Sequence, residues 1–131
     1  MTYSDPALNA VLEDLLDPAS VEVIFRGASG GLNVRRGTVA DAVQALNQHP
    51  HLRAFAREDV PPELYFKDNA RILKIVVIPD LGWHLSTKAW LEKRTRLSHG
   101  DHGYDPASPY MSALLVAHGT RIKSGTIRPA R

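Results

Sequence analysis

The sequence has 131 residues, of which 44% are hydrophobic and 23% are charged; this length and composition fit one globular domain and exclude a disordered chain. The formal net charge is +2 and basic residues are interleaved with acidic ones, so specific nucleic-acid binding is not expected. The lack of cysteine excludes disulfides and thiolate metal sites. Neither a signal peptide nor an apolar run of membrane-spanning length is recognisable, and the localisation stays unknown.

The first predicted element is an amphipathic helix close to the N-terminus. Ser4-Asp5-Pro6 offers a capping side chain followed by proline, which is typical of a helix start. Apolar residues then recur at i, i+3, i+4, i+7 and i+8 between residues 8 and 16, which places them in one stripe on a helix. Asp17-Pro18 ends the segment.

A β-hairpin is predicted next. Val21–Arg26 is rich in β-branched residues and indicates a strand, residues 27–31 are glycine-rich and indicate a turn, and Leu32–Arg36 indicates a returning strand. Phosphate-binding loops also follow strands, but this turn lacks the Lys and Ser/Thr of a P-loop and no helix is predicted directly after it. A hairpin turn is therefore favoured over a phosphate site.

The middle of the chain predicts a second helix and another strand. Thr38 is a capping residue, and the apolar residues that follow it up to Leu46 have helical spacing. The helix ends at His49-Pro50 because the residue before a proline avoids helical geometry. Leu52–Arg57 then predicts a half-buried or edge strand.

The second half of the chain contains the strongest strand signal, the nearly all-aliphatic run Ile72–Ile78. Residues 79–82 predict a turn, and Trp83–Thr87 is the expected hairpin partner. Residues 92–110 predict a long loop, and such loops in compact domains are usually functional or loosely ordered. Met111–Ala117 predicts a short buried strand. The fold class that follows is α+β, a small sheet of about four to six strands with two helices packed on one face.

Histidines supply several candidates for metal ligation. His49 and His51 flank a proline, and on a strand they would face one side and could share a metal ion. A polar connection between helix and strand is the favoured interpretation of this pair. His84 follows a predicted tight turn, and a structural or surface role is expected for it.

The densest cluster of candidate ligands consists of His99, Asp101, His102 and Asp105. Zinc takes three or four nitrogen, oxygen or sulfur ligands in a tetrahedral arrangement, and this loop contains enough of them. Ordering a flexible loop around an ion costs about 1–2 kcal/mol per residue. Taken without further information, these residues favour a solvated turn and leave a metal site open.

Residues 100–125, GDHGYDPASPYMSALLVAHGTRIKSG, resemble the C-terminal catalytic motif of the nucleotide pyrophosphatase/phosphodiesterase (type I phosphodiesterase) family within the alkaline phosphatase superfamily. The resemblance consists of His102-Gly103-Tyr104-Asp105, Met111, the apolar stretch Ala113–Ala117, Gly119 and Lys123. Residues 60–83, VPPELYFKDNARILKIVVIPDLGW, are similar to a second stretch of the same family, with its Asn-x-Arg-Ile, aliphatic strand and Asp-x-Gly-Trp. Pro106, Thr120 and Ile122 depart from the family pattern.

The resemblance implies a cofactor and one ligand for it. Members of this family bind two zinc ions, which clamp the charge of the transferred phosphoryl group. By similarity, His102 is the last of the zinc ligands, while Tyr104 and Asp105 are supports that order the loop around it. The family's nucleophile, aspartate ligands and Asp-His-Gly-Met element precede these motifs and have no counterpart in this sequence, so no catalytic residue is assigned.

The expectation is a fragment of a zinc-dependent hydrolase of phosphodiester or pyrophosphate bonds with nucleotide-type substrates. Residues 1–90 would form a cap-like α+β insertion, and residues 91–131 the loop and the returning segment of the catalytic core. The expected partner is the remainder of the parent catalytic domain. The fragment alone is expected to be inactive and to bind zinc without high affinity, because one imidazole cannot hold two ions.

Two alternatives remain open. A stand-alone α+β binding module without catalytic activity would offer its arginines to an acidic partner, namely Arg35, Arg36, Arg53 and Arg57. A small zinc-binding protein would use His99, Asp101 and His102 together with the His49/His51 pair.

Overall fold

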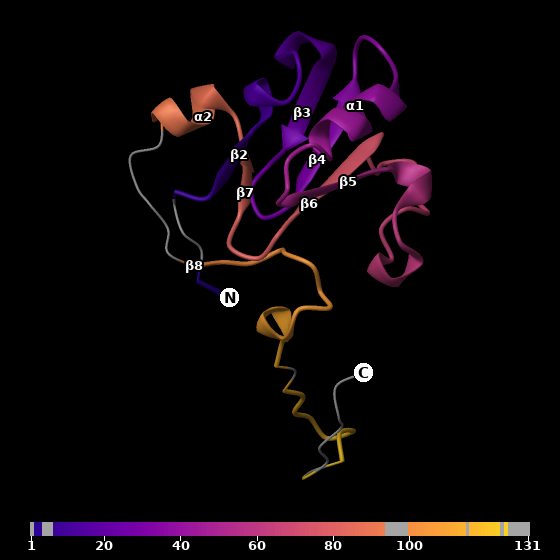
Figure 1. Ribbon diagram of the computed structural model, residues 1–131. Coiled ribbons are helices and arrows are strands. Elements are labelled where there is room, and N and C mark those ends of the chain that lie inside the picture. The colour runs from indigo at the N-terminus through magenta and orange to yellow at the C-terminus, as the bar shows by residue number, and fades with distance from the viewer. Residues whose placement is uncertain (1, 4–6, 94–99, 115, 124, 126–131) are drawn as a thin grey trace.

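A four-stranded antiparallel sheet with the strand order β3-β4-β6-β5 forms the centre of the computed structural model (Figure 1). The structure describes residues 2–3, 7–93, 100–114, 116–123 and 125. The sheet consists of β3 (Val21–Phe25), β4 (Gly30–Val34), β5 (Leu52–Ala56) and β6 (Ile75–Pro79). The predicted hairpin, both later strands and the α+β fold class are confirmed.

The helix α1 (Val39–Leu46) connects β4 to β5 and packs against one face of this sheet. It begins where the sequence predicts, because the Thr38 hydroxyl oxygen accepts the backbone N–H of Asp41 at 3.1 Å and so satisfies a donor of the first turn. Leu46 on its inner side is fully buried and belongs to the same core cluster as Leu32 and Leu52. Burial of this apolar stripe is what stabilises so short a helix.

The strand β6 divides its side chains between two cores. Ile75 and Val77, both at 0% exposure, lie in the cluster that α1 covers. Val76 and Ile78 point to the opposite face, where they pack with Val60. The alternation follows from the two-residue period of a strand, and burial on both faces explains why the sequence of this strand is aliphatic throughout.

Two glycines that the sequence assigns to the turn belong instead to β4. A Cβ atom at Gly30 would lie 2.5 Å from Cδ2 of Leu85, and one at Gly31 would collide with the Phe25 ring and with Leu73. Glycine at these positions lets neighbouring side chains lie close against the strand. The glycine-rich stretch is thus a packing feature of the sheet, with a turn shorter than predicted.

Two small ribbons lie beside the main sheet. β2 (Asn9–Val11) runs parallel to β7 (His84–Ser86), and β1 (Thr2–Tyr3) pairs with β8 (Gly100–Asp101) in the antiparallel sense. Helix α2 (Lys88–Lys93) follows β7. Figure 1 shows β7 beside the end of the main sheet, with β8 below it.

The N-terminal helix prediction is wrong. Residues 8–16 contain β2 followed by one 3-10 turn, Leu12–Asp14. Ala10 and Leu12 are buried, and Leu15 and Leu16 pack against the same core, so the predicted apolar positions are used with a different backbone. The parallel pairing with β7 supplies backbone hydrogen bonds that a helix would otherwise make internally, and this tertiary contact overrides the local pattern. The hairpin prediction, which paired Trp83–Thr87 with the aliphatic strand before it, is therefore also wrong, because β7 pairs with β2.

The predicted buried strand at Met111–Ala117 is also wrong. Met111 ends a 3-10 helix, and Leu114 and Val116 are 90% and 79% exposed. An apolar run forms a strand only where a partner strand accepts its hydrogen bonds, and no strand assigned in the described residues pairs with it. Other 3-10 helices in the described residues are Pro18–Ser20, Arg57–Asp59 and Pro62–Leu64. Within the described part of the chain, no helix has the length and apolar character needed to cross a membrane.

Candidate functional site

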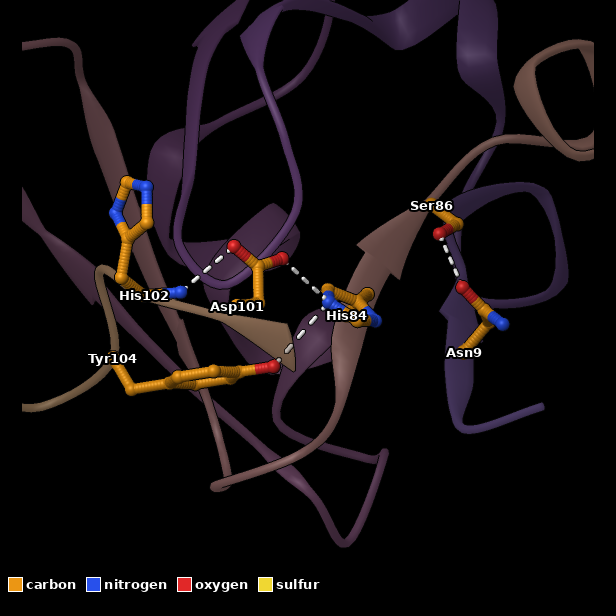
Figure 2. A network of polar contacts seen from close by, with 6 residues as sticks. All are labelled: Asn9, His84, Ser86, Asp101, His102 and Tyr104. Atoms are coloured by element: carbon orange, nitrogen blue, oxygen red, sulfur yellow. Dashed lines mark hydrogen bonds and ion pairs between the residues drawn. The ribbon is translucent and has the colours of Figure 1, made fainter. Parts of the chain in front are cut away.

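A buried histidine at the start of β7 joins two segments that are distant in sequence. His84 is 4% exposed, and its Nε2 lies 2.9 Å from Oδ2 of Asp101 on β8 and 3.3 Å from the hydroxyl oxygen of Tyr104 (Figure 2). Tyr104 is itself 5% exposed. We call these three residues the His84 network.

The protonation of the His84 network follows from its partners. Nδ1 of His84 is buried and has no hydrogen-bond partner among the described residues. In the neutral imidazole this favours the proton on Nε2, which then donates to Asp101, because a buried N–H donor without an acceptor is costly. Burial, followed by the charge of Asp101, raises the pKa of Tyr104 to about 12, so the phenol keeps its proton at neutral pH.

The carboxylate of Asp101 is occupied on both oxygens. Oδ2 faces His84, and Oδ1 accepts the backbone N–H of His102 at 2.8 Å. The His102 imidazole, in contrast, is exposed and forms no hydrogen bond or ion pair with the described residues, and Figure 2 shows its ring directed away from His84. Asp101 is therefore an internal support of the loop, and His102 offers its ring nitrogens to the outside.

The other side of the loop is fixed to the main sheet. Oδ2 of Asp105 pairs with Nη2 of Arg53 on β5 at 2.7 Å, and Oδ1 accepts the backbone N–H of Ala107 at 2.9 Å. The hydrogen bond from Arg53 is the main reason that the pKa of Asp105 lies below its ordinary value. Between the two anchors, Gly103 has φ +93°, a backbone conformation that favours glycine. Tyr104 and Asp105 thus contact other parts of the fold from within the loop, and their support of a metal ligand stays a prediction.

The His49/His51 pair forms a different arrangement. The His51 ring stacks on Trp83 with centroids 4.1 Å apart, His49 meets the same indole edge-on at 5.2 Å, and Nδ1 of His51 lies 3.0 Å from Oδ2 of Asp80. Burial, followed by the proximity of His51, lowers the pKa of His49. These contacts engage the pair in an aromatic cluster with Trp83.

A complete zinc centre does not fit the described residues. Among them, no group of three or more histidine and carboxylate side chains is placed to hold a metal ion. His99, the other histidine of the predicted cluster, lies outside the described residues. Of the cluster members that are described, the two carboxylates are occupied, so the donor set fits one contributed ligand, His102, and not a whole site.

An apolar cavity of about 250 Å³ lies against the loop. One wall is the face of the main sheet that α1 does not cover, and the other is the loop from Gly103 to Pro106. The side chains on the sheet side are Phe25, Leu64, Phe66, Val76 and Ile78. The residues that follow His102 therefore border a hollow of apolar character.

The His84–Asp101 contact is not predicted by the sequence. The two residues are 17 positions apart and belong to no periodic pattern, and the local context of His84 left both a structural and a surface role open. A histidine directly after a buried strand and a turn, together with an aspartate next to the candidate ligand, was the only signal. Their pairing depends on how β8 is placed beside β7.

The sequence profile of the family described as "Type I phosphodiesterase / nucleotide pyrophosphatase" matches residues 2–105. This match covers most of the chain and includes the His84 network and His102. The chain belongs to the type I phosphodiesterase / nucleotide pyrophosphatase family.

Individual relatives agree with this assignment. Human ectonucleotide pyrophosphatase/phosphodiesterase family member 5 is 29% identical over 120 residues, which are 91% of this chain and 24% of that protein. A human bis(5'-adenosyl)-triphosphatase, ENPP4, is 35% identical over 79 residues, or 60% of this chain and 16% of the relative. The solved structure of human ENPP5 superposes with a TM-score of 0.71 at 28% identity, covering 82% of this chain and 28% of that one. The chain thus spans about a quarter or less of the length of these curated relatives.

Proposed function

We propose that this chain supplies the cap region and the last metal ligand, His102, to a zinc-dependent hydrolase of phosphodiester or pyrophosphate bonds. The observation that carries the proposal is the contrast within one loop: the carboxylates of Asp101 and Asp105 are bound internally, whereas the His102 imidazole is exposed without a partner among the described residues. An imidazole with a fixed main chain and an unoccupied nitrogen is suited to ligate a metal ion. Membership of the family supplies the reaction class.

The remaining ligands and the nucleophile are proposed to lie outside these 131 residues. In support, the curated relatives are several times longer than the matched region. Residues 1–90 would form the cap-like insertion at the rim of the site, and residues 91–131 the loop and returning segment of the catalytic core. The apolar cavity beside Tyr104 agrees with a cap that contacts the apolar part of a substrate.

Nucleotides are the proposed substrate class. One relative is named as a bis(5'-adenosyl)-triphosphatase, and an inactive variant of murine ENPP5 was solved in complex with AMP. Both names describe those proteins, and they support the same class here because the chain shares their family. An acidic protein partner is not proposed, since Arg35 and Arg53 are paired with Glu22 and Asp105.

Hydrolysis of a chromogenic phosphodiester by the purified chain, with and without zinc, tests this proposal. Two-metal hydrolases place a metal beside both the attacking and the leaving oxygen, so we expect no turnover above that of buffer. Clear zinc-dependent turnover would contradict the proposal. A second arm is zinc titration by calorimetry: tight stoichiometric binding that His102→Ala abolishes would point instead to a small zinc-binding protein.

A further inference from the structure

The His102 main chain lies between two residues that contact the same buried imidazole. Asp101, on its N-terminal side, reaches Nε2 of His84 at 2.9 Å, and Tyr104, two positions after it, reaches the same nitrogen at 3.3 Å. Figure 2 shows both contacts converging on His84 from the two ends of the turn. We propose that His84 is the positioning residue for His102, holding the turn at residues 101–104 in one conformation.

The strand that carries His84 makes many contacts with the core. Its strand, β7, pairs in parallel with β2 over all three of its residues, and the Ser86 hydroxyl donates to Oδ1 of Asn9 at 2.6 Å. Leu85 between them is 1% exposed and forms backbone hydrogen bonds with Gly27. His84 therefore contacts the turn from a well-packed strand of the core.

Asp101 connects the buried His84 side chain to the main chain of His102. Its carboxylate links the buried His84 to the backbone N–H of His102 within one residue, and hydrogen bonds to an ionised acceptor are stronger than neutral ones. Without His84, this partly exposed carboxylate would be free to rotate toward solvent, and the His102 N–H would lose its fixed acceptor. The role of His102 as a metal ligand rests on the function proposed above, whereas the conformation of the turn does not.

Amide hydrogen exchange measured by NMR on the full chain tests the inference. We expect the His102 N–H to exchange about tenfold faster in His84→Ala, while the N–H of Val77 in β6 keeps its rate. His84→Gln, which can donate to Asp101 from a similar place, is expected to restore part of the protection at His102. A selective loss at residues 101–104 with rescue by glutamine separates positioning from general destabilisation.

The matched control is Asp80→Asn, which alters the other His–Asp pair, His51–Asp80. It is expected to leave exchange at His102 unchanged. If His84→Ala does not fold, Tyr104→Phe replaces it, because it removes one of the two contacts at nearly constant volume and should raise exchange at His102 a fewfold. Unchanged exchange at His102 in folded His84→Ala, or in Tyr104→Phe where that variant replaces it, would overturn the inference.

A zinc titration followed at the His102 imidazole resonances separates this inference from the proposed function. If zinc shifts these resonances in the wild-type chain but exchange at His102 does not depend on His84, the function stands and the positioning role fails. If zinc leaves His102 unaffected while exchange responds as expected, the positioning role stands and the metal-ligand assignment fails.

Discussion

Two histidine–aspartate pairs among the described residues have nearly the same length and very different surroundings. His84 and Asp101 are 2.9 Å apart, with side chains 5% and 35% exposed. His51 and Asp80 are 3.0 Å apart, with side chains 39% and 48% exposed. Exposed ion pairs contribute about 0–1 kcal/mol because water and salt screen them, whereas a buried side chain such as His84 also contributes through its packing and its hydrogen bonds. Burial, and not distance, distinguishes their expected contributions.

The pairs also differ in what they connect. The buried pair leads through Asp101 and Tyr104 to the turn that carries His102, the proposed metal ligand. The exposed pair leads to Trp83 and His49. Of these two pairs, the one with His84 contacts the turn that carries the proposed ligand, and the other does not.

The largest effect is expected from His84→Ala. The substitution removes a buried ring together with its contacts to Asp101 and Tyr104, so we expect a loss of about 2–3 kcal/mol in the free energy of unfolding. Chemical denaturation measures it. Asp80→Asn, the equivalent change in the exposed pair, should cost less than about 0.5 kcal/mol. Equal losses in the two variants would contradict the comparison.

The next largest effect concerns alkaline pH. Tyr104 has its pKa raised to about 12 in the folded chain, above the ordinary value near 10. Between these values the unfolded phenol loses its proton first, so stability falls as pH rises, by a total on the order of 2 kcal/mol. Denaturation across this range should show a smaller decline for Tyr104→Phe. Equal declines of stability with pH in the wild type and in Tyr104→Phe would show that the pKa of Tyr104 is not raised.

Structural features that depend on residues close in sequence are the ones that the sequence predicts. The Thr38 cap, the hairpin at residues 21–34 and the aliphatic strand are determined by neighbouring residues, and they were predicted. The helix expected at residues 8–16 failed because β7, more than 70 residues later, supplies a pairing partner. Met111–Ala117 failed for the opposite reason: its apolar pattern lacks a paired strand among the described residues.

The candidate site also has one residue that a local motif predicts and others that depend on a contact between distant residues. His102 is predicted as a ligand from a short motif that resembles a family; the family is confirmed, and the ligand role stays a prediction. The role of Asp101 was not predicted, because whether a loop carboxylate ligates a metal or supports its neighbour depends on what faces it. His84 faces it from a strand 17 residues away, and such a contact leaves no periodic signal.

A smaller effect is expected at the other anchor of the loop. Arg53→Ala should raise the pKa of Asp105 toward its ordinary value, because the hydrogen bond from Arg53 is the main cause of the lowered pKa. A carboxyl with a lowered pKa stabilises the fold above its unfolded pKa and loses that contribution as pH falls through the folded pKa. We expect at most about 1 kcal/mol, since the Arg53 side chain is 48% exposed. Carbon NMR of the carboxyl group measures the shift, with Arg35→Ala as the control that should leave Asp105 unchanged.

The smallest effect belongs to the exposed pair. Burial and His51 lower the pKa of His49, while the charge of Asp80 raises it. Asp80→Asn should therefore lower the pKa of His49 further, by a small amount that NMR titration of its ring protons resolves. Because the ordinary histidine pKa lies near 6.5, a lowered pKa means that stability is present above this value and is lost as pH falls. A rise in the His49 pKa in this variant would contradict the assigned cause.

His102 is proposed to be an available metal ligand of this chain. Side-chain NMR of its six histidines during zinc titration tests that claim most directly. We predict weak binding that does not saturate at stoichiometric zinc, with the largest shifts at His102 and loss of those shifts in His102→Ala. Tight one-to-one binding that shifts several histidines together and persists in His102→Ala would contradict it.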